Sequence, residues 1–116
     1  MQTVQVDGRR VFVGRSEAAV GEEQPPAMLI HGAGLTHAAW AVPRRGLARN
    51  ARTVLAIDLP GHGRSAGPPL NTIAALAEWI VRLLDALAVE RAGLAGHSLG
   101  ALVALDVAAR YPARVS

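Results

Sequence analysis

The chain has 116 residues, of which 51% are apolar, so it is long enough for one small domain with a hydrophobic core. Its 12 basic residues are scattered arginines that give a formal net charge of +3, without the basic cluster and interleaved aromatic residues of a nucleic-acid-binding face. The absence of cysteine excludes disulfide bonds, a thiolate metal site and a cysteine nucleophile. No signal-peptide pattern opens the chain and its apolar stretches are too short for a bilayer, so we expect a cytoplasmic protein that binds no membrane.

The N-terminal residues predict a β-hairpin. Asp7-Gly8 separates two segments with alternating apolar residues, Thr3–Val6 and Arg9–Val13, and this dipeptide favours the tight turn between antiparallel strands. Residues 14–26 are polar and contain glycine and proline, which predicts a connection. Ala27–Ile30 is a continuous apolar run and predicts a strand that is buried on both faces.

Helices and strands alternate in the middle of the chain. Thr36 is the best N-cap for a short helix that passes Trp40 and ends near Asn50. Thr53–Ile57 predicts the next buried strand, and Asn71 is expected to cap the most regular helix. The apolar stripe of that helix consists of Ile73, Leu76, Ile80, Leu83, Leu84 and Leu87.

The segment Gly96-His97-Ser98-Leu99-Gly100 connects a short apolar run to a helix expected over Leu99–Arg110. Its Gly-x-Ser-x-Gly spacing is that of a nucleophile elbow, a sharp turn that lifts a serine hydroxyl clear of the backbone. The glycines lack the Cβ atoms that such a turn would crowd, and the helix directs free N–H groups toward developing negative charge. The pattern arises by chance in roughly one of 25 such chains, so a closely packed glycine turn is the alternative.

The alternation of strands and helices predicts an α/β fold with a mostly parallel sheet flanked by helices and preceded by the hairpin. Ligands bind such sheets at the carboxyl ends of the strands. Three segments follow predicted strand ends, namely His31-Gly32-Ala33-Gly34, Asp58–Ser65 and Gly96–Gly100. We therefore expect them to form one site for a small-molecule substrate.

In order and spacing these three segments, together with Trp40, resemble the motifs of the α/β-hydrolase fold family over nearly the whole chain. The resemblance implies that residues 1–116 are the N-terminal part of a single α/β-hydrolase domain, a partial or truncated fold without the part that carries the catalytic acid and histidine. It implies that Ser98 is the nucleophile and that the backbone N–H groups of Leu99 and Ala33 form the oxyanion hole. Pocket or structural roles would fall to His31, Gly32, Gly34, Asp58, His62, Gly96, His97 and Gly100.

One departure from the family concerns the catalytic triad. The family orders it as serine, acid and histidine, whereas the residues after Gly100 include Asp106 but no histidine. Asp106 lies within the expected helix and is a poor candidate for the acid. Among the histidines present, His62 is the more plausible substitute base, although hydrogen-bond geometry to Ser98 would have to be met.

We therefore expect a serine hydrolase that attacks an ester, thioester, lactone or carbon-carbon bond through Ser98, needs no cofactor or metal, and is inactive as this chain alone. One alternative is a non-catalytic remnant or binding module that keeps the pocket. Another is cofactor-free haloperoxidase or acyltransferase activity on the same scaffold. We also expect self-association, because the edge of the strand that carries Ser98 would be uncovered.

Overall fold

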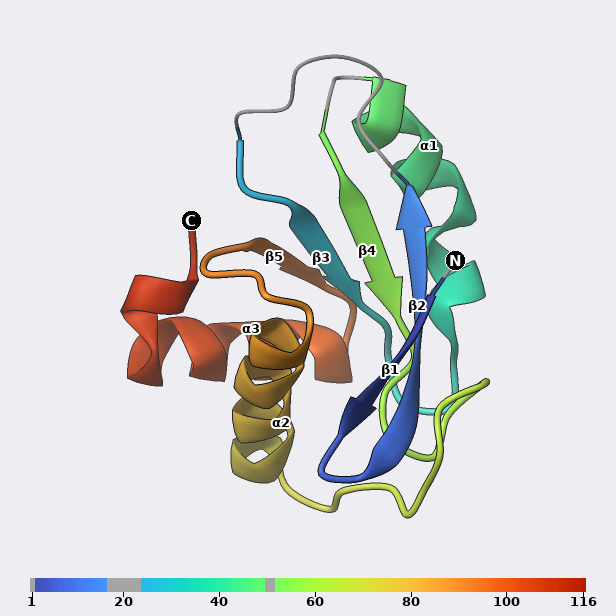
Figure 1. Ribbon diagram of the computed structural model, residues 1–116, viewed down its shortest axis with the longest axis vertical. Coiled ribbons are helices and arrows are strands. Elements are labelled where there is room, and N and C mark those ends of the chain that lie inside the picture. Colours follow the sequence, from blue (N-terminus) through green and yellow to red (C-terminus); the bar gives the residue numbers. More distant parts are fainter. Residues whose placement is uncertain (1, 17–23, 50–51) are drawn as a thin grey trace.

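The computed structural model describes residues 2–16, 24–49 and 52–116 (Figure 1). The elements in chain order are β1 (Gln2–Val6), β2 (Arg9–Ser16), β3 (Ala27–Ile30), η1 (His37–Trp40), α1 (Ala41–Arg49), β4 (Val54–Ile57), α2 (Ile73–Ala86), β5 (Gly93–Gly96), α3 (Leu99–Arg110) and η2 (Pro112–Arg114). The strands form one sheet in the order β1-β2-β4-β3-β5. Within the described ranges, no helix combines the length and the hydropathy of a membrane span.

The N-terminal hairpin is confirmed. β1 and β2 pair antiparallel with Val6 opposite Arg9, and the turn residues Asp7 and Gly8 have φ angles of 53° and 74°. Positive φ at both turn positions matches the twist of the two strands, which is why Asp-Gly is favoured there. However, β2 continues to Ser16 and pairs antiparallel with β4, so a connection beginning at residue 14 is wrong. Residues 17–23 of the expected connection lie outside the described residues.

The central strands β3, β4 and β5 are parallel, with β3 in the middle. All residues of β3 and β4 are buried, as their unbroken apolar sequences predict. Alternate residues face two different layers. Met28, Ile30, Leu55 and Ile57 pack with α2 and α3, whereas Leu29, Val54 and Ala56 pack with Trp40 of η1. The α/β fold with helices on both faces is therefore confirmed, and its sheet is mixed because β1 and β2 are antiparallel to their neighbours.

Side-chain caps explain where the helices begin. Thr36 caps η1 as predicted, and its Oγ1 accepts a hydrogen bond from the Ala38 N–H at 3.2 Å. The predicted Asn71 cap of α2 is wrong by one residue. Thr72 is the N-cap, and its Oγ1 accepts from the Ala75 N–H at 3.0 Å. Both residue types suit an N-cap, but only the one directly before the first helical residue can reach the third helical N–H.

Candidate active site

Ser98 occupies the sharp turn between β5 and α3. Its φ and ψ angles are 56° and −114°, a region that residues with a side chain rarely adopt, and the residue is exposed. Although Ser98 stands at the N-cap of α3, its side chain makes no capping hydrogen bond. The hydroxyl is therefore not used to cap α3. The next N–H groups of the helix, from Gly100 to Leu102, donate to the carbonyls of His97 and Ser98, which leaves the Leu99 N–H for another acceptor.

The glycines on either side make this turn possible. A Cβ atom on Gly96 would collide with the backbone of Gly100, and a Cβ atom on Gly100 would collide with the carbonyl oxygen of Ile30. Close packing is thus part of the reason for the Gly-x-Ser-x-Gly spacing. It does not explain the exposed hydroxyl at its centre, which is the feature that the pattern of a nucleophile elbow predicts.

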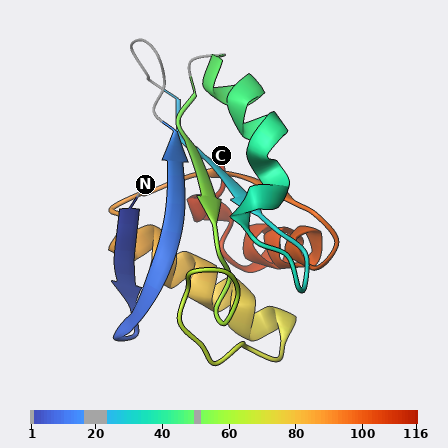
Figure 2. The same cartoon turned by 90° about the vertical axis from the view of Figure 1, so that its right-hand side faces the viewer.

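The loop after β3 lies directly beside this turn. A Cβ atom on Gly32 would be 3.5 Å from the Cβ atom of Ser98 and 3.2 Å from the Nδ1 atom of His97. The His97 N–H donates a hydrogen bond to the Ile30 carbonyl at 3.1 Å, which ties the two segments together. The expected convergence of residues 31–34 with the Ser98 turn is therefore present. The loops after β3 and β4 leave their strands at the same end of the sheet (Figure 2).

Two N–H groups at this edge are available to a ligand. Among the described residues, neither the Ala33 N–H nor the Leu99 N–H donates a hydrogen bond to another atom of the protein. Leu99 is the first residue of α3, where the helix N–H groups have no partner within the helix. Both groups can therefore receive an oxygen that carries negative charge.

His31 is buried and connects the loop after β3 to the loop after β4. Its Nδ1–H donates to the Gly32 carbonyl at 2.7 Å, and its Nε2 accepts from the Leu59 N–H at 3.0 Å. A carbonyl can only accept and an amide N–H can only donate, so these partners fix one neutral tautomer. Burial lowers the pKa of His31 below its ordinary value of 6.5, and outweighs the opposite effect of the Gly32 hydrogen bond.

Asp58 fixes the loop after β4 from within the core. Its buried carboxylate accepts hydrogen bonds from the Arg64 N–H at 2.9 Å, the His37 N–H at 2.7 Å and the His37 Nδ1–H at 2.8 Å. Burial by itself would raise the pKa of Asp58, but the hydrogen bonds from Arg64 and His37 lower it below its ordinary value of 3.8. The carboxylate thus joins the loop after β4 to the segment around His37. No motif in the sequence predicts the hydrogen bond between His37 and Asp58.

His62 and His37 lie at the same edge and are bound to groups other than the Ser98 hydroxyl. His62 donates from Nδ1 to the Pro60 carbonyl at 3.0 Å and accepts at Nε2 from the Gly34 N–H at 3.1 Å. His37 lies against Asp58 and against the ring of Phe12 in β2, with ring centroids 4.7 Å apart. Within the described ranges, no histidine nitrogen forms a hydrogen bond with Ser98.

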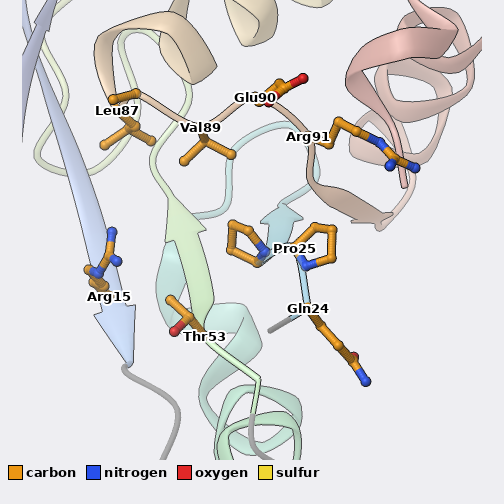
Figure 3. A pocket seen from close by; sticks show the side chains of 10 residues that line it. Arg15, Gln24, Pro25, Thr53, Leu87, Val89, Glu90 and Arg91 are labelled. Carbon is orange, nitrogen blue, oxygen red and sulfur yellow. The ribbon is translucent and has the colours of Figure 1, made fainter. Parts of the chain in front are cut away.

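Two cavities lie at opposite ends of the sheet. One of about 170 Å³ adjoins the Ser98 turn and is lined by His97, Leu35 and Trp40 among others. A larger one of about 520 Å³ lies at the amino ends of β3, β4 and β5, between residues such as Pro25, Thr53 and Val89 (Figure 3). Size alone would favour the larger cavity. Ligands of parallel sheets bind at the carboxyl ends of the strands, so the smaller cavity belongs to the candidate site.

The site thus combines an exposed serine with a positive φ angle, between a strand and a helix, with the unpartnered Leu99 and Ala33 N–H groups, which is the arrangement that the Gly-x-Ser-x-Gly pattern predicts. Residues 25–116 match the family model of the alpha/beta hydrolase fold. The chain therefore belongs to the alpha/beta hydrolase fold family, and the resemblance inferred from the sequence is confirmed.

The chain is similar to proteins with several named activities. It is 42% identical over 97 residues to the dihydrolipoyllysine-residue acetyltransferase component of the acetoin cleaving system of Pseudomonas putida, covering 83% of this chain and 26% of that protein. It is 34% identical over 114 residues to a putative non-heme haloperoxidase of Mycobacterium phage D29, covering 97% and 39%. The enol-lactonase of Burkholderia xenovorans LB400 superposes with a TM-score of 0.87 at 28% identity, covering 99% and 44%. The chain thus spans less than half the length of each.

Proposed function

We propose that the chain carries the nucleophile and the oxyanion hole of a serine hydrolase that acts on an ester, thioester, lactone or activated carbon-carbon bond. The observation that supports this most directly is the conformation of Ser98, which is exposed at a φ angle of 56°. Backbone strain of this kind costs about 1–3 kcal/mol and gathers at functional sites. A turn that served packing alone would gain nothing from a serine in that conformation.

The reaction follows from the groups around Ser98. Its Oγ attacks the carbonyl carbon of the substrate, the new O–C bond forms, and the electron pair of the carbonyl moves onto its oxygen. The N–H groups of Leu99 and Ala33 donate to that oxyanion. Collapse of the tetrahedral intermediate expels the leaving group and gives an acyl-enzyme, which water then hydrolyses. The hydroxyl proton must pass to a base.

The base in this proposal is not supplied by His31, His62 or His37 in the hydrogen bonds that they form. Both ring nitrogens of His31 and of His62 are occupied by backbone partners, so neither can accept the proton of Ser98 without breaking a hydrogen bond. His37 lies over β4 and β2, and β3 separates β4 from β5. His37 donates its Nδ1–H to Asp58, and among the described residues its other ring nitrogen forms no hydrogen bond with Ser98. We infer that the chain alone reacts slowly at Ser98.

Similarity to an acetyltransferase component and to a putative haloperoxidase supports a second candidate. The same acyl-enzyme can transfer its acyl group to an acceptor other than water. Acyltransferase or cofactor-free haloperoxidase chemistry would therefore need the same Ser98 and the same oxyanion hole, and would differ in the acceptor. A non-catalytic remnant would keep the turn but not the reactivity.

Covalent labelling tests the proposal on the chain itself. A fluorophosphonate probe phosphonylates an activated serine with loss of fluoride, and added imidazole can act as an external base. We expect labelling at Ser98, identified by mass spectrometry of the peptide, that accelerates with imidazole and is absent in Ser98→Ala. A folded chain that is not labelled at Ser98, even with imidazole, would favour the non-catalytic remnant.

A further inference from the structure

Residues 32–35, which include the Ala33 N–H, form a β-turn. The orientation of its middle peptide, between Ala33 and Gly34, is defined by the backbone angles. The Leu35 N–H donates to the Gly32 carbonyl at 3.1 Å, and Gly34 has a φ angle of 75° while Ala33 is not among the residues with positive φ. Positive φ at the third position alone is the signature of a type II turn. A type I turn has nearly the same Cα path but the opposite orientation of the peptide between Ala33 and Gly34, so this turn can change form by rotating that peptide.

His62 holds the middle peptide in its present orientation. The Gly34 N–H, which belongs to that peptide, donates to the His62 Nε2 at 3.1 Å. A peptide rotation would point this N–H away from the ring and leave it without the bond. Glycine at position 34 permits the positive φ angle of the type II form, and the bond to His62 is a further restraint that favours this form.

The acceptor itself is held firmly. The Nδ1–H of His62 donates to the Pro60 carbonyl at 3.0 Å, which leaves Nε2 unprotonated and able to accept. The ring lies against the ring of the buried His31, with centroids 5.1 Å apart. The surrounding loop is pinned by the buried Asp58, whose backbone carbonyl accepts from the Ser65 Oγ at 2.7 Å. His62 therefore transmits the position of the loop after β4 to the loop after β3.

We propose that His62 is a positioning residue for the reaction at Ser98. Its neutral imidazole holds the Gly34 N–H and so anchors the 32–35 turn to the loop after β4, which fixes the position of the turn whose Ala33 N–H donates to the oxyanion. This inference rests on the proposed function for its catalytic consequence. The bond between Gly34 and His62 itself does not depend on that function.

The first test measures the hydrogen bond on the chain of residues 1–116. We expect a through-hydrogen-bond ¹⁵N–¹⁵N scalar coupling between the Gly34 amide and the His62 Nε2, and ¹⁵N shifts of a ring protonated at Nδ1 only. A His62 ring protonated at Nε2 instead, or a Gly34 amide without the coupling, would overturn the proposal. A structural role of His62 unrelated to Gly34 would not produce this signature.

The second test compares two substitutions of His62. In His62→Gln the side-chain oxygen can take the place of Nε2 as the acceptor, whereas His62→Leu has a similar bulk and no acceptor. Loss of an oxyanion donor costs about 100- to 1,000-fold in rate, so a misdirected donor is expected to slow labelling of Ser98 by about tenfold in His62→Leu. His62→Gln should recover most of the wild-type rate, and melting temperatures verify that both variants fold.

The outcomes separate the two proposals. Equal labelling rates for His62→Leu and the wild type would exclude a positioning role. Equally slow labelling of His62→Gln and His62→Leu would also exclude it, because the acceptor would then be irrelevant. A wild-type chain that shows the coupling but no labelling would contradict the proposed function while leaving the bond between Gly34 and His62 established.

Discussion

Gly32 and Ser98 face each other across the candidate site, because a Cβ atom on Gly32 would lie 3.5 Å from the Cβ atom of Ser98. The same Cβ atom would be 3.2 Å from the carbonyl oxygen of His97, which is tighter than an ordinary van der Waals contact. Only glycine allows the loop after β3 to approach the turn after β5 this closely. The absent side chain at position 32 therefore sets the separation between the Ala33 N–H and the Ser98 hydroxyl.

Gly32→Ala should impair reactivity more than folding. The added methyl group has to displace its surroundings by a few tenths of an ångström, because it would meet the ring nitrogen and the carbonyl oxygen of His97 at 3.2 Å and the Ser98 Cβ atom at 3.5 Å. We expect the labelling rate of Ser98 to fall by about tenfold, given that donor geometry is worth more than this in oxyanion holes. The free energy of unfolding, measured by denaturant titration, should fall by about 1 kcal/mol. An unchanged labelling rate would show that the loop does not contribute to the reaction.

The strain at Ser98 can be measured without any substrate. Glycine adopts a φ angle of 56° freely, whereas alanine does not, so Ser98→Gly should be more stable than Ser98→Ala by about 1 kcal/mol. Both variants remove the hydroxyl, so the comparison isolates the backbone. The measurement is chemical denaturation followed by circular dichroism. Equal stabilities would mean that the turn is not strained in solution.

Gly100 and Gly46 form a matched pair of glycines in helices. A Cβ atom on Gly100 would overlap the carbonyl oxygen of Ile30, so Gly100→Ala should push α3 away from β3 and cost about 3 kcal/mol or more. A Cβ atom on Gly46 in α1 meets nothing within 4 Å, so Gly46→Ala should stabilise the chain by up to about 1 kcal/mol. Similar thermal unfolding of the two variants would contradict the packing of α3 on β3.

Local requirements made much of this fold predictable from the sequence. The Asp7-Gly8 turn, the apolar run of β3 and the glycines around Ser98 each reflect a constraint within a few residues of the chain. The end of α3 at Arg110 likewise follows from Pro112, which disfavours a helical conformation at the residue before it. Such features depend little on the rest of the molecule.

Features that depend on how strands align could not be predicted. Gly14–Ser16 is polar and rich in turn-forming residues, and it becomes strand only because β4 pairs with it. The bonds from His37 to Asp58 and from Gly34 to His62 join loops of different strands, so no spacing along the chain reveals them. The sequence predicts at which end of the sheet a loop lies, but it does not predict the hydrogen-bond partner of each side chain in that loop.

The buried His31 predicts how stability depends on pH. Folding lowers the pKa of His31, so at acidic pH the unfolded chain binds more protons than the folded chain. The contribution of His31 to the free energy of unfolding is therefore complete above pH 6.5. It is lost as the pH falls through the lowered pKa of the folded state. His31→Gln should be less stable than the wild type at pH 7.5, and the difference should shrink toward pH 5. Denaturant titrations at both pH values measure it, and a difference that grows at pH 5 would mean that the folded chain favours the protonated ring of His31 instead of the neutral one.

Self-association is expected through the edge that carries β5. β5 is the last strand of the sheet, and along its outer edge the described residues supply a single bridge, from Ala92 to Val115. On α3, which packs beside β5, Leu102 and Leu105 are 51% and 68% exposed. Unpaired strand edges and exposed apolar side chains favour association, so we expect light scattering to report a mass above that of the monomer.

A pair of charge substitutions locates this association. Leu105→Glu places a charge on the exposed face of α3 and should shift the chain toward monomer. Val42→Glu places the same charge on α1, at a side chain that is 75% exposed on the other face of the sheet, and should leave the measured mass unchanged. If Val42→Glu dissociates the assembly as well, net charge rather than the β5 edge controls it. If the wild type is a monomer at every concentration, this edge does not self-associate.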